Sequence, residues 1–219
     1  MIVELDQVTK DHDVLGATSL RLTSGEAVLV EAETEQRPSV LGLIASGRMR
    51  ADSGTVTIDG RTDNKQLRAR VALVDAPDVN EPSAGVSLAG VVAEELMFAG
   101  LASGPRAVTR WLEENGAGAL GSQAMGTIAP GIRVRLLTEL ALLRDGVGGI
   151  VIVSPDRHGG HPEAWWGTAQ ELAARGVAVL VIVGHAAVVA LEASASPRPV
   201  KRRRPRIYSP LGRTRKATS

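Results

Sequence analysis

The 219-residue chain has no cysteine, and only 2% of its residues are aromatic. The absence of cysteine excludes disulfides and thiolate metal sites. A core must therefore be built from Val, Leu, Ile and Ala, for which the 44% hydrophobic content is ample. No apolar run approaches the roughly 18 residues of a membrane-spanning helix. Charged residues interrupt the first segment, where a secretory signal would lie, so we expect a cytosolic protein.

Acidic residues are missing from the end of the chain. Nine basic residues and no acidic one lie between Pro197 and Ser219. The remaining residues, 1–196, carry 16 basic against 24 acidic groups, which leaves a net charge of −8. We predict one folded domain over residues 1–195 and a basic, Pro-rich, disordered tail over residues 196–219. Such a tail can bind anionic lipid head groups, bind nucleic-acid phosphates, or only keep the protein in solution.

The stretch from Gly25 to Gly60 organises the rest of the domain. A short apolar run (residues 27–30) predicts a buried strand, a polar loop (31–39) follows it, and an apolar stripe (40–45) predicts a helix. Strand, loop and helix in this order are typical of a phosphate-binding loop. A β-branched strand (55–58) comes next. Together with alternating strands over residues 1–9 and 15–22, it predicts a small antiparallel sheet.

The later elements alternate between strands and helices. Apolar runs predict buried strands at residues 150–153 and 177–183, and a strand led by charge at residues 68–74. Helical spacing predicts helices at residues 87–98, 108–114, 162–175 and 186–195, and a loop followed by a helix within residues 128–144. We therefore predict an α/β fold with a mostly parallel core sheet, an antiparallel β subdomain and a short helical insert at about residues 77–125.

The frame resembles an ATP-binding cassette (ABC) ATPase domain, a P-loop NTPase-like fold. The resemblance rests on strand order, on spacing and on a frame of five residues: Gly25, Gly54, Gly60, Gly131 and His185. It places the phosphate loop at Glu31, Thr34, Glu35, Gln36, Arg37, Pro38 and Ser39, with Arg37 where the family has lysine. These positions are the predicted phosphate contacts.

The chemistry of this loop departs from the family. Glycines let consecutive backbone N–H groups surround a phosphate, and a lysine adds a positive charge. Here Glu31, Glu33 and Glu35 place three carboxylates where polyphosphate would lie, and each repels it. Pro38 removes a backbone donor at the helix N-terminus. Arg37 keeps a positive charge in a different geometry. The sequence of this loop therefore indicates a protein that keeps the family's fold but has lost ordinary phosphate binding.

Other family positions are altered as well. The resemblance places Ala129 and Gly131 in the signature loop that clamps the γ-phosphate of an opposite monomer. It places Asp75 and Ser154 at magnesium-linked positions, and Pro155 replaces the catalytic glutamate. His185 is in register with the switch histidine, the one predicted catalytic residue.

Two further histidine patterns give weaker signals. His12 is the nearest candidate for stacking on adenine, and a solvated turn histidine is the alternative. His158, His161 and Asp156 hint at a metal site in a Gly/Pro turn. Neither pattern, by itself, assigns a metal or nucleotide role.

The resemblance implies an ATP-binding subunit, intact or degenerate, of an ABC-type membrane transporter. Such a subunit would bind ATP and magnesium if activity is retained, form a homo- or heterodimer of cassettes, and dock on a membrane-embedded subunit at the inner face of the cell membrane. The replaced motifs put hydrolysis in doubt. The alternative is a non-catalytic pseudo-ATPase that serves as an interaction or regulatory module at the membrane surface. Association with nucleic acid is a third, less favoured hypothesis.

Overall fold

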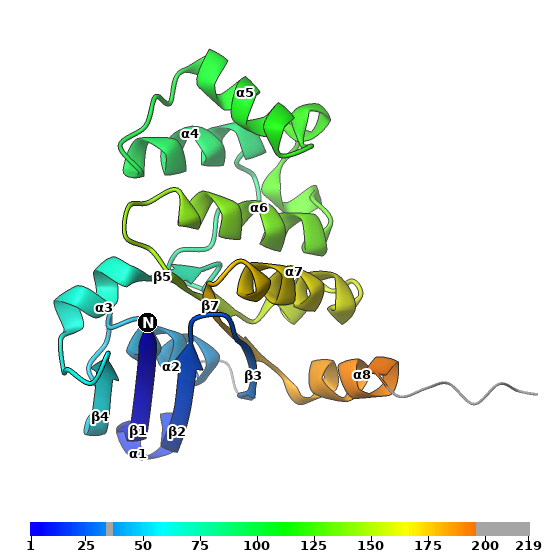
Figure 1. Cartoon of the computed structure of the whole chain (residues 1–219). Coiled ribbons are helices and arrows are strands. Elements are labelled where there is room, and N and C mark those ends of the chain that lie inside the picture. Colours follow the sequence, from blue (N-terminus) through cyan, green and yellow to red (C-terminus); the bar gives the residue numbers. More distant parts are fainter. Residues whose placement is uncertain (34–36, 196–219) are drawn as a thin grey trace, which may run out of the picture.

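Two sheets organise the protein, as the computed structural model shows for residues 1–33 and 37–195, with the side chains of His12, Asp13 and Ala195 outside the description (Figure 1). The first is a three-stranded antiparallel sheet in the order β2-β1-β4, and the second is a four-stranded sheet in the order β3-β7-β6-β5. All three pairings within the second sheet are parallel. The predicted α/β fold with a parallel core and an antiparallel subdomain is therefore confirmed.

The antiparallel sheet comprises β1 (Ile2–Lys10), β2 (Leu15–Thr23) and β4 (Ser53–Ile58), and the single turn α1 (Asp11–Val14) joins its first two strands. Val3 and Leu5 of β1 are buried at alternate positions, as the sequence predicts, and a register shift after Leu5 brings Val8 to the buried face. A bulge in β1 brings its backbone close to Gly54: a Cβ at this position would lie 2.4 Å from the Asp6 carbonyl oxygen. Only glycine fits there.

The parallel sheet comprises β3 (Ala27–Glu31), β5 (Val71–Val74), β6 (Gly149–Val153) and β7 (Ala178–Val183). Every residue of β5, β6 and β7 is buried, which explains their unbroken apolar sequences. Odd and even positions of these strands face opposite sides of the sheet. One side packs on α2 (Arg37–Ala45) and the antiparallel sheet, and the other packs on α6 (Pro130–Leu142) and α7 (Pro162–Ala174).

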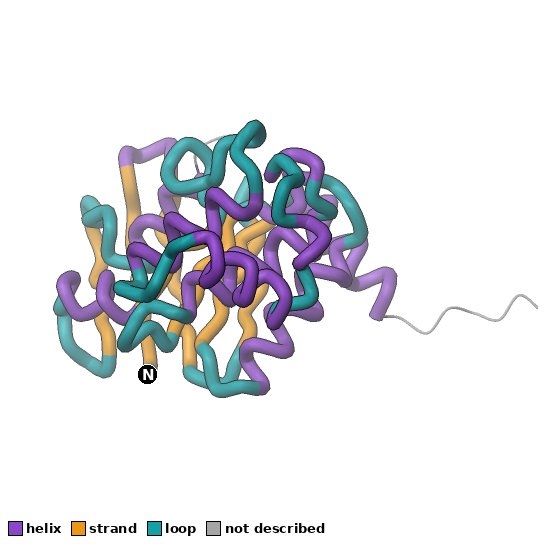
Figure 2. Tube along the Cα trace, turned by 90° about the horizontal axis from the view of Figure 1, so that it is seen from above, coloured by secondary structure: helices purple, strands orange, loops and turns teal. Residues whose placement is uncertain are grey.

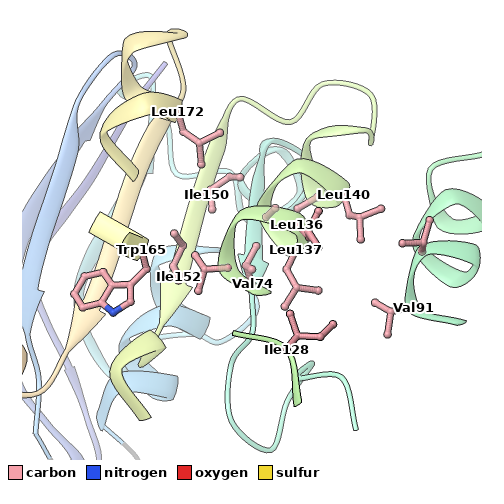
Figure 3. Close-up of a cluster of buried hydrophobic side chains, with 14 of the residues drawn as sticks. Val74, Val91, Ile128, Leu136, Leu137, Leu140, Ile150, Ile152, Trp165 and Leu172 are labelled. Atoms are coloured by element: carbon pink, nitrogen blue, oxygen red, sulfur yellow. The ribbon is translucent and has the colours of Figure 1, made fainter. Parts of the chain in front are cut away.

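Seen from above, helices lie over the strands (Figure 2). The larger core cluster joins Val74 of β5 and Ile150 and Ile152 of β6 to the leucines of α6 and to Trp165 of α7 (Figure 3). The remaining elements are α3 (Asn64–Arg70), α4 (Leu88–Phe98), α5 (Pro105–Glu114), α8 (His185–Ala195) and the 3₁₀ turns η1 (Gly118–Leu120), η2 (Met125–Thr127) and η3 (Pro155–His158). None of the helices within residues 1–33 and 37–195 is long and apolar enough to cross a membrane.

The helices α4 and α5 and the turns η1 and η2 form the insert between β5 and α6, and they lie beyond α6 at the end of the molecule opposite the antiparallel sheet (Figure 1). Ser87 caps α4, because its hydroxyl oxygen accepts a hydrogen bond from the Gly90 N–H at 3.2 Å. Trp111 of α5 is buried in the core. The boundaries of the domain, the insert and the tail as units stay a prediction.

Two element boundaries were predicted wrongly. Residues 68–70 belong to α3 and not to the strand, which begins at Val71. The carboxylate of Asp63 accepts hydrogen bonds from the N–H groups of Lys65 and Gln66 and so starts a helix that the charged sequence concealed. Helix α2 begins at Arg37, three residues earlier than predicted. Pro38 is compatible with this start because the first turn of a helix needs no N–H from it.

Candidate functional site

The predicted site residues gather at the carboxyl edge of the parallel sheet. β3 ends at Glu31, β7 at Val183, β6 at Val153 and β5 at Val74. The residues that follow these strands therefore meet along one edge, which is where open α/β sheets bind ligands. This edge brings together Glu31, Glu33, Asp75, Ser154, Asp156 and His185.

Two backbone N–H groups at the start of α8 are occupied by carboxylates of the chain itself. The Glu33 Oε1 atom accepts a hydrogen bond from the His185 N–H at 2.8 Å, and the Asp156 Oδ2 atom accepts one from the Gly184 N–H at 3.1 Å. Helix N-termini of this kind suit phosphate because their N–H groups and the helix dipole both favour an anion. Here the anion is supplied internally, so a phosphate at this place would meet negative charge.

His185 also faces a carboxylate of the chain. Its Nδ1 atom lies 3.2 Å from the Glu31 Oε2 atom, and both side chains are exposed. The hydrogen bond that the protonated ring donates to the Glu31 carboxylate, followed by the charges of Glu31, Glu33 and Glu192, raises the pKa of His185 above its usual range. His185, which the resemblance aligns with the switch histidine, therefore contacts Glu31 and Glu33 of this chain.

Replacement of Glu31 by Gln is expected to lower the pKa of His185 toward its ordinary value, because it removes the carboxylate that stabilises the imidazolium by a hydrogen bond and by its charge. The raised folded pKa means that the contact stabilises the protein at low pH and is lost as pH rises through that pKa. An NMR titration of the imidazole signal measures the change. Glu26→Gln, at an exposed glutamate outside this contact, is the control. An unchanged titration in Glu31→Gln would contradict the assignment.

Arg37, at the position where the family has lysine, contacts a backbone carbonyl of the antiparallel subdomain. Its Nε atom donates a hydrogen bond to the Val14 carbonyl at 3.1 Å, so the half-buried side chain contacts the end of α1. The Ser39 hydroxyl donates to the Pro77 carbonyl at 3.4 Å, and Pro38 is buried. Thr34, Glu35, Gln36 and the His12 side chain lie outside the described residues. Their predicted phosphate and adenine contacts therefore stay predictions.

Asp75 is the centre of a buried cluster of charges. Its Oδ1 and Oδ2 atoms accept hydrogen bonds from Nη2 and Nε of Arg133 at 2.6 and 3.0 Å, a bidentate pair. The Nη2 atom of Arg157 lies 3.1 Å from Oδ1, and Nε2 of His158 lies 2.9 Å from Oδ2. The Asp75 side chain is 0% exposed. Asp75 directly follows β5, and its partners come from α6 and η3.

Both carboxylate oxygens of Asp75 already contact positively charged or hydrogen-bonding partners inside the cluster. Burial opposes its ionisation, but the hydrogen bonds from His158 and Arg133 and the charges of Arg157 and Arg133 outweigh burial and hold the pKa of Asp75 far below its usual range. A magnesium ion would have to compete with these cations for both oxygens. Asp75 therefore does not fit the family's role of holding magnesium.

The other magnesium-linked position offers no carboxylate. Ser154 has a left-handed backbone (φ +47°), and its N–H donates to the Ile182 carbonyl at 2.8 Å. His158 contacts Asp75, which removes it from the metal pattern considered with Asp156 and His161. Across residues 1–33 and 37–195, no three His, Asp or Glu side chains are grouped so that they could hold a metal ion.

The signature-loop positions serve to pack two helices together. Ala129 precedes α6 without a side-chain cap, and Pro130 occupies the first turn. A Cβ on Gly131 would lie 2.7 Å from the Cβ of Ala164 in α7. Gly131 is therefore required for the close approach of α6 and α7, a structural reason that applies without any nucleotide.

Comparisons with known proteins place the fold. No protein-family profile and no curated protein sequence matches the chain. A dimeric bacterial ABC transporter cassette is 20% identical with a TM-score of 0.65, covering 86% of this chain and 90% of that chain. A nucleotide-free ATP-binding cassette from an ABC transporter is 17% identical with a TM-score of 0.62, covering 87% and 84%. A putative ABC transporter ATP-binding protein from Pyrococcus furiosus is 13% identical with a TM-score of 0.60, covering 84% and 92%. The chain thus has the fold of the ATP-binding cassettes of ABC transporters.

Proposed function

We propose that the chain is a degenerate cassette subunit of an ABC-type membrane transporter, one that contributes its fold to the assembly without binding or hydrolysing ATP at its own phosphate-loop positions. The observation that carries this proposal is the pair of hydrogen bonds at the start of α8. Glu33 and Asp156 occupy the N–H groups of His185 and Gly184 at the edge where a nucleotide phosphate would bind. A carboxylate and a phosphate cannot share such a place without strong repulsion.

Three further features support the absence of hydrolysis. The Asp75 carboxylate is paired with Arg133, Arg157 and His158. Ser154 brings no carboxylate to the end of β6, and Pro155 brings no general base. Phosphoryl transfer needs metal ions and positive groups that neutralise the charge of the transferred phosphate. The start of α8 instead faces the carboxylates of Glu31, Glu33 and Asp156.

The partners follow from the same proposal. The chain would pair with a second cassette, identical or different, and dock on a membrane-embedded subunit at the cytoplasmic face of the membrane. The fold shared with a dimeric bacterial cassette supports the pairing. If a cassette with intact motifs is the partner, ATP and magnesium would be held mainly by that partner's residues.

The test is isothermal titration of the full-length protein with Mg-ATP. We expect no saturable heat up to about millimolar ATP, where even a weak complex of about −4 kcal/mol would be visible. Arg37→Ala and His185→Ala variants are titrated in parallel. Saturable binding that both substitutions weaken would overturn the proposal and favour an ATP-binding subunit whose altered loop still holds phosphate.

A non-catalytic interaction module that works outside a transporter is the second candidate. It shares the inactive edge, so titration with ATP does not separate the two. Purification from detergent-solubilised membranes does: a transporter subunit is expected to be recovered with a membrane-embedded protein in a fixed ratio. Recovery without such a protein favours the second candidate.

A further inference from the structure

A hollow of about 580 Å³ lies between α6 and α7, near the starts of both helices. Small residues leave room in it: Ala129, Gly131, Ala164 and Gly167. Ile132 also lines the hollow and is 37% exposed, so a large apolar side chain is open to solvent there. The hollow therefore offers space and apolar surface to a side chain from another segment.

The α7 side of the hollow is acidic. Glu163 and Glu171 line it and lie eight residues apart, which is about 12 Å along a helix. Arg135 of α6 is the one arginine or lysine among the described residues that line the hollow, and its Nη2 atom donates to the Asn115 carbonyl at 3.0 Å. His161 is the remaining titratable residue of the lining. A basic segment would therefore find two carboxylates along α7.

The chain leaves its described part beside this hollow. The Ser194 hydroxyl, in the last turn of α8, donates a hydrogen bond to the Glu163 carboxylate. Arg198 follows four residues later, a distance that an extended chain spans in about 14 Å. Nine basic residues and no acidic one lie between Pro197 and Ser219, whereas residues 1–196 carry a net charge of −8. The basic tail thus begins at an acidic surface of its own domain.

We propose that the start of the tail docks in this hollow of its own chain, with Val200 inside the hollow. Arg198 pairs with Glu163 at the end that is near α8. Arg202 pairs with Glu171 at the other end. Charge-assisted contacts of this kind hold an arginine to a carboxylate. The docked tail withholds these arginines from the phosphates of lipids or nucleic acids. The proposal rests on neither a transporter partner nor ATP.

The spacing of the tail matches the spacing of the hollow. Side chains two residues apart on an extended chain lie on the same side, so Arg198, Val200 and Arg202 face one surface. Arg198 and Arg202 are then about 13 Å apart, close to the separation of the two glutamates along α7. The residue after Arg198 is a proline, which favours an extended backbone at that position.

Disulfide trapping in the full-length protein tests this contact. The chain has no cysteine, so Ile132→Cys/Val200→Cys contains a single pair. A disulfide needs Cα atoms within about 7 Å of each other. We expect this pair to close within one molecule, in oxidised glutathione, about tenfold faster than Val189→Cys/Val200→Cys. Val189 is the matched control because it is 48% exposed on α8, within reach of the same tail.

The charged contacts have their own variants. In the trapping variant, Glu163→Gln/Glu171→Gln is expected to slow closure to near the rate of the control pair. Raised salt is expected to act in the same direction, because it screens the attraction. Glu113→Gln/Glu114→Gln, at two exposed glutamates of α5, is the control and should leave the rate unchanged. Unfolding midpoints verify that each variant is folded.

Three results would overturn the proposal. The first is an equal rate for the Ile132 pair and the Val189 pair, since the tail would then have no preferred place. The second is a rate that the glutamate substitutions in α7 leave unchanged. The third is a disulfide that joins two molecules, seen as a dimer on a non-reducing gel, because the tail would then occupy a second copy of the chain.

Discussion

Replacement of Asp75 by Ala is expected to lower the free energy of unfolding by about 3–5 kcal/mol, because it leaves the buried guanidinium of Arg133 without its partner. The Arg133 and Asp75 side chains are 3% and 0% exposed, so water cannot replace the lost contact. Asp75 lies at the end of β5, just before the insert, and Arg133 lies in α6, just after it. The pair therefore links the segment that enters the helical insert to the segment that leaves it.

Chemical denaturation of a double-mutant cycle measures this effect. Arg133→Met is expected to destabilise less than Asp75→Ala, because Asp75 keeps Arg157 and His158 as partners. Asp75→Ala/Arg133→Met is expected to lose clearly less than the sum of the two, because the buried guanidinium is then absent as well. Lys10→Ala is the control: it breaks the surface pair with Asp52 and should cost no more than about 1 kcal/mol. Additive, small losses for Asp75 and Arg133 would contradict a buried pair.

Replacement of Trp165 by Ala is expected to cost about 3–5 kcal/mol, the range found for large aromatic residues in protein cores. Trp165 is 1% exposed and lies between α7 and the parallel sheet (Figure 3). Removal of its ring leaves a cavity that the strands of a sheet cannot collapse to fill.

The neighbouring substitutions make this test specific. Trp165→Phe should cost much less than Trp165→Ala, because the indole Nε1 atom has no hydrogen-bond partner among the described residues and its loss breaks no contact seen there. Trp166→Ala, at the adjacent half-buried tryptophan, is the matched control for ring size. Urea midpoints rank the three variants. A loss for Trp166→Ala as large as that for Trp165→Ala would contradict the assignment of Trp165 as the core residue.

The backbone plan of this protein was largely predictable because its signals are local. Unbroken apolar runs at residues 150–153 and 177–183 predicted buried parallel strands, and alternation in residues 2–8 predicted an exposed sheet. The prediction failed at residues 68–70, where a helix cap at Asp63 outweighed a pattern that resembled a strand. A cap depends on one side chain and its geometry, which an average over a window conceals.

The sequence by itself determined which family motifs are replaced, since a missing glycine or carboxylate is visible in the letters. Only the tertiary structure decided what the replacing residues do. Asp75 contacts Arg133 and His158, which are 58 and 83 residues away, and Glu33 contacts His185 across 152 residues. Such pairs depend on which strands end side by side, and hydrophobic periodicity carries no information on that order. Local pattern therefore determined the elements, and the packing of the sheet determined the chemistry at its edge.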